Sequence, residues 1–173
     1  MVYINIIKQN NIQHKTRNAE HGTRNACIMA TVQRFEDLEV WKKAREICKY
    51  ISQLTQKDHF SRDFSLKDQI KRSSGSVMDN IAEGFERGGN KEFVNFLTYS
   101  KGSLAEVRSQ SYRAYDYNYI NEEELNNLIV DSVSLSERLG KFINYLKNSD
   151  FKGIKFTKQN QNDKELNDKE INE

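Results

Sequence analysis

Residues 121–146 read NEEELNNLIVDSVSLSERLGKFINYL. Apolar or small residues recur in this stretch at alternating steps of three and four, which keeps them on one face of a helix. These residues are Leu125, Leu128, Ser132, Leu135, Leu139, Phe142 and Leu146. A seam sustained over about three heptads is typical of the coiled-coil-like packing found in helical bundles. The stretch therefore predicts a long helix that packs against other helices.

Three further helices are expected upstream of this one. Apolar residues at helical spacing predict helices over residues 38–56, 66–87 and 91–117. Gly88 and Gly89 are expected to end the second of them. The side chains expected to cap helix starts are those of Asp37, of Ser65 together with Asp68, and of Asn121 together with Glu124.

These helices have similar lengths and mostly short connections, so neighbours must run in opposite directions. The chain also has no proline, which is the residue that most sharply breaks a helix. The predicted fold is all-α, an antiparallel up-down-up-down four-helix bundle over residues 35–148. Only the connection at 57–64 is longer, and we expect it to fold over one end of the bundle.

The segments that flank the bundle differ from it in composition. Of 173 residues, the first 34 carry five basic residues and one acidic residue, and they contain the repeat H-x-T-R-N-A-x at 14–20 and 21–27. This leader is too polar to form a core and is expected to be disordered. It is either a basic arm or translated upstream sequence before a start near Met29, and the second interpretation is favoured because the helical pattern follows Met29. Residues 149–173 are expected to form a charged flexible tail.

Composition also limits which cellular compartment and which binding partners are expected. No apolar run approaches the ~18 residues of a membrane span, and two cysteines make no disulfide framework, so a cytoplasmic location is expected. Residues 35–148 carry 17 basic and 18 acidic residues. Nucleic-acid binding is therefore not implied by net charge, although the basic residues can still gather on one face.

The sequence shows no catalytic, metal or cofactor motif. The predicted helices contain no histidine, and no Glu-x-x-His pair, clustered cysteines, phosphate-binding loop or nucleophile elbow occurs. We therefore expect a protein that is not an enzyme, with no cofactor, no metal and no small-molecule substrate.

Small and polar residues at inward positions are the exception to the apolar pattern. Glycines inside helices cost about 1 kcal/mol each relative to alanine, so Gly75, Gly84 and Gly102 predict close approach of neighbouring helices. The polar residues on these faces, expected to form a hydrogen-bonded layer, are Asn80, Glu83, Ser103 and Glu106. They either specify helix register and oligomer contacts or line a ligand pocket.

Residues that recur at helical spacing outside the core stripes predict two surfaces. Ile129, Val133 and Ile143 form a second apolar stripe beside the seam, which predicts self-association. The candidates for a basic face are Lys42, Arg45 and Lys49 on the first helix, with Arg87 and Lys91 beside the Gly88-Gly89 turn. Acidic residues lie near each of them, so this face is either a nucleic-acid surface or a mixed, solvated one.

Four ordered blocks resemble a known family: FEDLEVWKKA (35–44), QIKRS (69–73), NIAEGFER (80–87) and GSLAE (102–106). They are similar to the four-helix bundle proteins encoded in intervening sequences of bacterial 23S ribosomal RNA genes. The likeness covers about residues 35–147. Met78 stands where that family often has proline, which predicts a straighter second helix, and the leader has no counterpart in the family pattern.

The resemblance implies a homopentameric ring of bundles with no established enzymatic activity. The same bundle type occurs in accessory proteins of diversity-generating retroelements, which contact nucleic acid and a reverse transcriptase. By resemblance we expect an oligomer associated with ribosomal RNA or other nucleic acid. The alternatives are a purely structural or protein-interaction oligomer, for example an accessory subunit for a nucleic-acid enzyme, and, more remotely, an enzyme.

Overall fold

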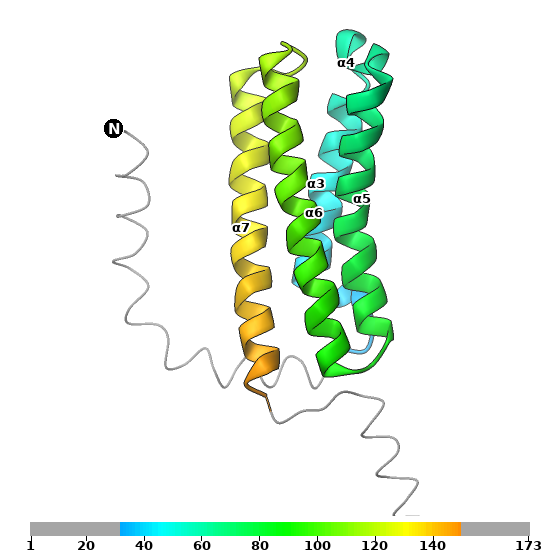
Figure 1. The fold of residues 1–173 in the computed structure, drawn as a ribbon, viewed down its shortest axis with the longest axis vertical. Coiled ribbons are helices and arrows are strands. Elements are labelled where there is room, and N and C mark those ends of the chain that lie inside the picture. The colour runs from blue at the N-terminus through cyan, green and yellow to red at the C-terminus, as the bar shows by residue number, and fades with distance from the viewer. Residues whose placement is uncertain (1–31, 150–173) are drawn as a thin grey trace, which may run out of the picture. The chain divides into compact units, whose positions relative to one another are not determined.

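The computed structural model describes residues 32–149, which are helical apart from short connections (Figure 1). The elements are the 3₁₀ turn η1 (Phe35–Asp37) and the helices α3 (Glu39–Leu54), α4 (Asp58–Arg62), α5 (Phe64–Glu86), α6 (Asn90–Asp116) and α7 (Glu122–Lys147). No strand occurs in this part of the chain, so the prediction of an all-α protein is confirmed. The predicted leader and tail lie almost wholly outside the described residues.

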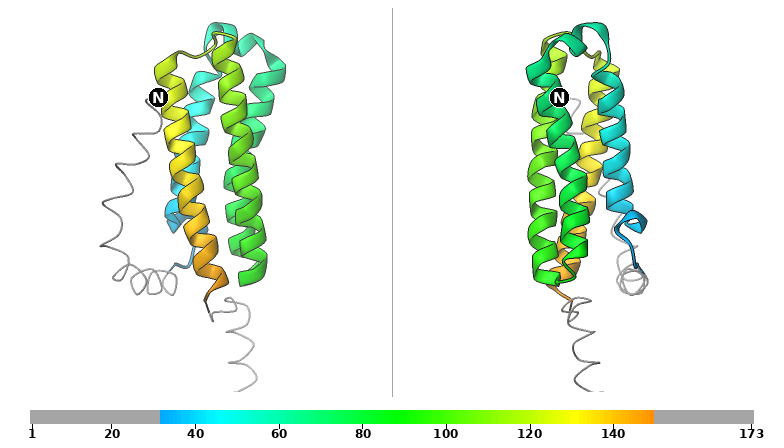
Figure 2. Two further views of the ribbon diagram at one scale, coloured as in Figure 1. Left: turned by 60° about the vertical axis from the view of Figure 1, so that its left-hand side comes forward. Right: turned by 90° about the vertical axis from the view of Figure 1, so that its right-hand side faces the viewer.

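The four long helices lie side by side in a helical bundle (Figure 2). The most extensive contact is between α5 and α6, followed by α6 with α7, α3 with α5, and α3 with α7. Within residues 32–149, no helix is both long enough and apolar enough to cross a bilayer. The core consists of the inward stripes of these helices, with Leu66, Ile81, Leu97, Leu135 and Leu139 almost fully buried.

The seam predicted for the last helix is confirmed except near its end. Phe142 is only half-buried and packs edge-on against Phe93, with 5.3 Å between ring centroids, while Ile143 is 8% exposed and belongs to the core. A straight helix has 3.6 residues per turn, so a strict heptad stripe drifts around it over successive turns. The assignment of Ile143 to an outer, self-associating stripe is therefore wrong.

The first helix starts differently from the prediction. Asp37 belongs to η1, and Leu38 occupies the N-cap position of α3 with no side-chain cap. Packing decides this start: Leu38 is 5% exposed, and the Phe35 ring contacts Trp41 edge-on at 5.1 Å. Burying these apolar groups stabilises the start of α3 without the predicted Asp37 cap.

The start of α5 is also different, because the 57–64 connection contains α4. Phe60 of α4 is 1% exposed and stacks on Tyr119 at 5.2 Å, which fixes the turn over this end of the bundle. Asp63 then follows α4 directly and caps α5 through a 2.9 Å hydrogen bond from Leu66 N–H. The predicted cap by Ser65 and Asp68 is wrong, since α5 already includes both residues.

Other helix ends follow the sequence signals. Gly88 follows the C-cap residue Arg87 of α5 and adopts a φ of 66°, a conformation that glycine tolerates at no steric cost, so the predicted end of this helix is confirmed. α5 continues without interruption through Met78. At α7, Asn121 and Glu124 form the predicted capping box, with each side chain bonded to the other residue's backbone N–H at 2.9 Å.

Candidate nucleic-acid interface

The predicted polar layer lies between α5 and α6. The Ser76 and Ser103 hydroxyls are 2.9 Å apart, and Asn80 Nδ2 donates to both Ser76 Oγ and the Ser76 carbonyl. Glu83 does not join them, because its carboxylate accepts from Arg87 Nη2 at 2.6 Å and is half exposed. The prediction is therefore correct for Asn80 and Ser103 and wrong for Glu83.

A second part of this layer joins the predicted Glu106 to two residues that the sequence did not single out, Ser73 and Gln110. Ser73 Oγ donates to Glu106 Oε2 at 3.0 Å and accepts from Gln110 Nε2 at the same distance. Ser73 and Gln110 are buried at 6% and 4% exposure. The usable signal was their helical phase, since Ser73 lies one turn before the core residue Val77. These bonds hold α5 and α6 in one register, which favours a structural role for the layer.

The interior glycines differ from one another in their surroundings. A Cβ on Gly84 would lie 2.5 Å from Phe96 Cβ and 2.9 Å from Phe93 Cδ2, so the predicted close approach of α5 and α6 is confirmed there. A Cβ on Gly102 would meet nothing within 4 Å, and one on Gly75 would reach only the Asp79 carboxylate at 4.0 Å. The prediction of close approach is wrong for Gly75 and Gly102.

The predicted basic residues divide into paired and unpaired ones. Lys42 donates to Glu39 at 2.9 Å, and this hydrogen bond raises the pKa of the Lys42 ammonium. Arg87 is likewise bonded to Glu83, which raises its pKa, and its guanidinium lies 4.8 Å from the centroid of the Phe96 ring. By contrast Arg45, Lys49 and Lys91 are exposed and make no ion pair within residues 32–149.

The structure places two further cations, Lys71 and Arg72, on α5, the helix that packs against the α3 helix of Arg45 and Lys49. Ser74 Oγ of α5 lies 3.7 Å from Cys48 Sγ of α3, which brings the flanks of these helices together at one level. Arg45 is three residues before Cys48, and Lys71 is three residues before Ser74, so both lie on these flanks. Lys49 follows Cys48 on the exposed side of α3, whereas Arg72 lies on the outer side of α5 that lines the hollow described below. The contact between these two helix flanks could not be predicted from the sequence, because Cys48 and Ser74 are far apart in the chain.

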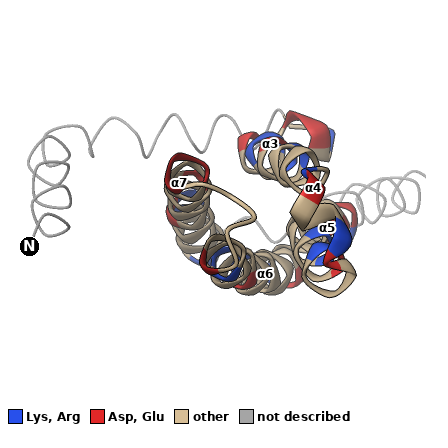
Figure 3. Cartoon of the chain, turned by 90° about the horizontal axis from the view of Figure 1, so that it is seen from above, with Lys and Arg blue, Asp and Glu red and all other residues tan. Residues whose placement is uncertain are grey.

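We refer to these residues, together with Lys67 one turn before Lys71, as the α3/α5 basic surface: Arg45, Lys49, Lys67, Lys71 and Arg72. Basic segments on both helices are visible in the end-on view of Figure 3. Within the described residues, none of these cations pairs with a carboxylate. Glu46, the nearest acid along α3, is occupied by Lys43 at 3.1 Å. Asp68 and Asp79 are the exposed acids at the two ends of the surface on α5.

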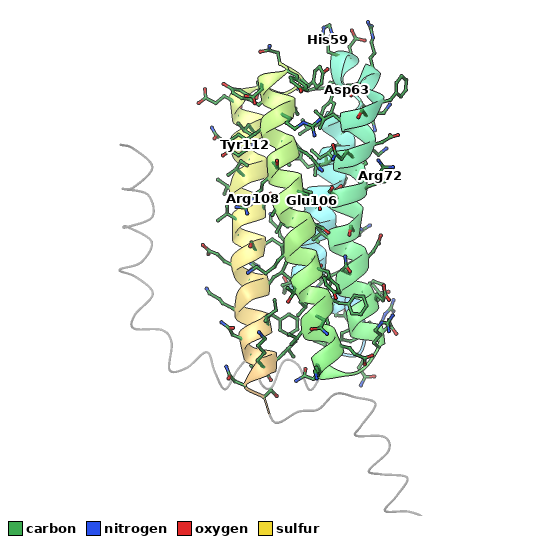
Figure 4. The ribbon with its side chains drawn as sticks, in the orientation of Figure 1. His59, Asp63, Arg72, Glu106, Arg108 and Tyr112 are labelled. Carbon is green, nitrogen blue, oxygen red and sulfur yellow. The ribbon has the colours of Figure 1, made fainter. Side chains whose placement is uncertain are left out.

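An open hollow of about 590 Å³ adjoins this surface on α5. Arg72 projects from α5 away from α7 (Figure 4). Cationic and neutral donors line this open space together with two carboxylates, those of Asp79 and Glu83. Its lining residues are Lys71, Arg72, Gly75, Ser76, Asp79, Asn80 and Glu83.

A different surface lies over α6 and α7. Val130 is 66% exposed, Tyr112 46% and Val133 37%, and Ile129 is half-buried beside them. Lys101 Nζ of α6 lies 3.5 Å from the position that a Cβ on Gly140 of α7 would take. Tyr112 lies on the same side of α6 as Lys101, and Ile129 and Val133 lie on the same side of α7 as Gly140, so these two sides are next to each other. We refer to Tyr112, Ile129, Val130 and Val133 as the α6/α7 apolar surface. Arg108, next to Tyr112 in Figure 4, has a buried Nε with no hydrogen-bond partner among the described residues.

Within residues 32–149, no group of His, Cys, Asp or Glu side chains is arranged to hold a metal ion. Cys48 is a half-buried free thiol against Ser74, and His59 lies exposed on α4.

Comparison with known proteins supports the resemblance seen in the sequence. A family model described as "23S rRNA-intervening sequence protein" matches residues 36–141. A solved structure of a protein of unknown function from the S23 ribosomal protein family of Bacteroides thetaiotaomicron VPI-5482 is similar in fold, with a TM-score of 0.56 and 24% identity. That alignment covers 60% of this chain and 97% of the other. No curated protein matches the chain. Because the family model spans more than half of its residues, the chain belongs to the 23S rRNA-intervening sequence protein family.

Proposed function

We propose that this protein is a non-enzymatic helical-bundle protein that associates with ribosomal RNA or another nucleic acid through the α3/α5 basic surface. The observation that carries this proposal is a group of cations on two helices, exposed except for the half-buried Lys67, that have no carboxylate partner among the described residues. Cations already neutralised by acids gain little from a phosphate, whereas unpaired ones release counterions when they bind it.

The proposal extends to the architecture and the assembly. The connections after α5 and α6 are short, and the four long helices lie side by side in both views of Figure 2, which supports an antiparallel up-down-up-down four-helix bundle. We expect this bundle to form a homo-oligomer in the bacterial cytoplasm, and the pentamer is the state that the family resemblance implies. An oligomer would repeat the α3/α5 basic surface, so that individually weak contacts add as avidity.

A structural or protein-interaction oligomer is the second candidate. The observation that favours it is the α6/α7 apolar surface, whose valines are exposed in the single chain. Exposed apolar patches rimmed by polar residues mark protein interaction sites. In this alternative the chain would act as an accessory subunit, and its cations would not contact nucleic acid.

A matched pair of variants distinguishes the two candidates. Lys49→Glu with Arg72→Glu reverses two cations of the α3/α5 basic surface, and Arg138→Glu with Lys141→Glu reverses one Arg and one Lys at exposed positions of α7. Binding of a 23S ribosomal RNA fragment is measured by fluorescence anisotropy between 50 and 200 mM salt. The first variant should flatten the slope of log K against log salt by about 1.4 to 1.8, and the control should leave it near the parent value.

Light scattering on the same samples checks that both variants keep the parent mass. Equal weakening by both variants would indicate a diffuse electrostatic attraction and reject the α3/α5 basic surface. Absence of RNA binding by the parent protein at 50 mM salt would reject the nucleic-acid role and leave the protein-interaction oligomer.

A further inference from the structure

Phe64 is the most exposed large apolar side chain among the described residues, with 70% of its surface accessible. It is the first residue of α5, directly after the Asp63 cap. The other phenylalanine of this connection, Phe60, is buried against Tyr119. Phe60, and not Phe64, therefore fills the apolar packing site at this end of the bundle. An exposed phenyl ring costs free energy in water, and most of the Phe64 ring is left in contact with solvent.

The Phe64 ring is fixed in relation to a cation. Lys67 Nζ lies 4.2 Å from the ring centroid, and the same ammonium donates to the Ser61 carbonyl at 2.8 Å. Lys67 therefore covers part of the ring by a cation–π contact while its charge stays near the surface. The rest of the ring remains open to solvent.

Phe64 also continues the α3/α5 basic surface. Residues 64, 67 and 71 recur at steps of three and four, so Phe64, Lys67 and Lys71 lie along one side of α5. At 1.5 Å per residue, the distance from Phe64 to Lys71 along the helix is about 10 Å. The acids near Phe64 are engaged: Asp58 pairs with Arg62 at 2.6 Å, and Asp63 accepts from Leu66 N–H and, at 3.3 Å, from the Tyr119 hydroxyl. Asp68 is the exposed acid of the next turn.

We propose that Phe64 is a stacking platform for an unpaired base, and that the preferred partner of the α3/α5 basic surface is single-stranded nucleic acid. This inference rests on the proposed function and narrows its partner class. Proteins that bind single strands combine cations along the backbone with aromatic rings on which bases stack. The bases of a duplex already stack on each other, so only a single strand or an unpaired end can use the Phe64 ring.

The test measures the affinity of a 12-nucleotide uridine RNA, a thymidine DNA of the same length, and an RNA duplex of 12 base pairs. Phe64→Leu keeps an apolar side chain and removes the ring, Phe64→Tyr keeps the ring, and Tyr99→Leu is the control at another exposed aromatic residue, 59% accessible on α6. Phe64→Leu should weaken single-strand binding by about fivefold or more without changing duplex binding. Phe64→Tyr and Tyr99→Leu should bind all three probes like the parent.

The outcomes separate this inference from the proposed function. Parent-like single-strand binding by Phe64→Leu, together with weakened binding by the Lys49→Glu and Arg72→Glu variant, would overturn the stacking role and keep the basic surface. No binding of any probe by the parent would reject both. A change of mass on Phe64→Leu in light scattering would show that the ring contacts another copy of the chain, which also overturns the inference. An effect on RNA but not on DNA would support stacking and identify RNA as the partner.

Discussion

Gly84 lies where α5 approaches α6 most closely, and its hydrogen is the only substituent that fits. Gly84→Ala would place a methyl group 2.5 Å from Phe96 Cβ, so either α6 or the Phe96 side chain must shift. Overpacking of this kind costs about 1 to 3 kcal/mol. We expect Gly84→Ala to lower the free energy of unfolding by that amount in urea denaturation.

Gly102→Ala is the matched control, because Gly102 is exposed in the middle of α6 and has open space around its Cα. Alanine there should raise the free energy of unfolding by about 0.4 to 1 kcal/mol through the lower entropy of the unfolded chain. Similar destabilisation by both substitutions would contradict the assignment of Gly84 to the helix contact.

At the level of elements, α7 is stabilised at its start by the capping box and by an ion pair from another part of the chain. Glu124 Oε2 lies 2.6 Å from Lys57 Nζ. Partial burial alone would raise the pKa of Glu124, but the hydrogen bonds from Lys57 and from Asn121 N–H lower it below its ordinary value of 4.5. A carboxyl group with a lowered pKa stabilises the fold above about pH 4.5, and this contribution is lost as the pH falls through the pKa of the folded state.

Glu124→Gln keeps a side chain that can complete the capping box and removes only the charge. It should lower the free energy of unfolding by about 1 kcal/mol at pH 7, and the difference from the parent should shrink below about pH 4. Thermal melts across this pH range measure the effect. Glu123→Gln, at an exposed position of the same turn, removes a charge near the helix N-terminus but no ion pair or capping bond, so it should have the smaller effect.

The short helix α4 is held to the bundle by Phe60. Phe60→Ala removes a buried ring that stacks on Tyr119, and it should cost about 3 to 5 kcal/mol of unfolding free energy. Phe64→Ala, four residues later at an exposed position, should change stability by less than about 0.5 kcal/mol. Comparable losses in guanidinium denaturation would mean that Phe64 is packed in the native state, and this would also remove it as a stacking platform.

For the whole molecule, the proposed binding and assembly surfaces use different helices. The α3/α5 basic surface and the α6/α7 apolar surface share no helix, so the protein can engage another copy and a nucleic acid at once. The α5–α6 contact between these pairs carries the hydrogen-bonded layer of Ser73, Ser76 and Gln110 and gives both surfaces a fixed support.

Val130→Asp with Val133→Asp places charges in the α6/α7 apolar surface and should reduce the particle mass in light scattering at micromolar concentration. Both valines are exposed in the single chain, so the helical content in circular dichroism should not change. Asn127→Asp with Asn144→Asp adds the same charges at exposed positions of α7 outside that surface and should keep the parent mass. A parent protein that is already monomeric would remove the self-association proposal.

Local chemistry in the sequence determined the helices, their seams, the Gly88 end, the Asn121–Glu124 cap and the family. These features depend on residues within about four positions of each other, where helical geometry alone relates the side chains. The sequence therefore predicted the all-α fold and the polar partners Asn80 and Ser103.

Only the tertiary structure decided which helix flanks meet and at what height, because side chains far apart in the chain set the rotation and the level of one helix against another. This put the α5 flank that carries Lys71 against the α3 flank that carries Arg45, and put Gly84, but not Gly102, against its neighbour.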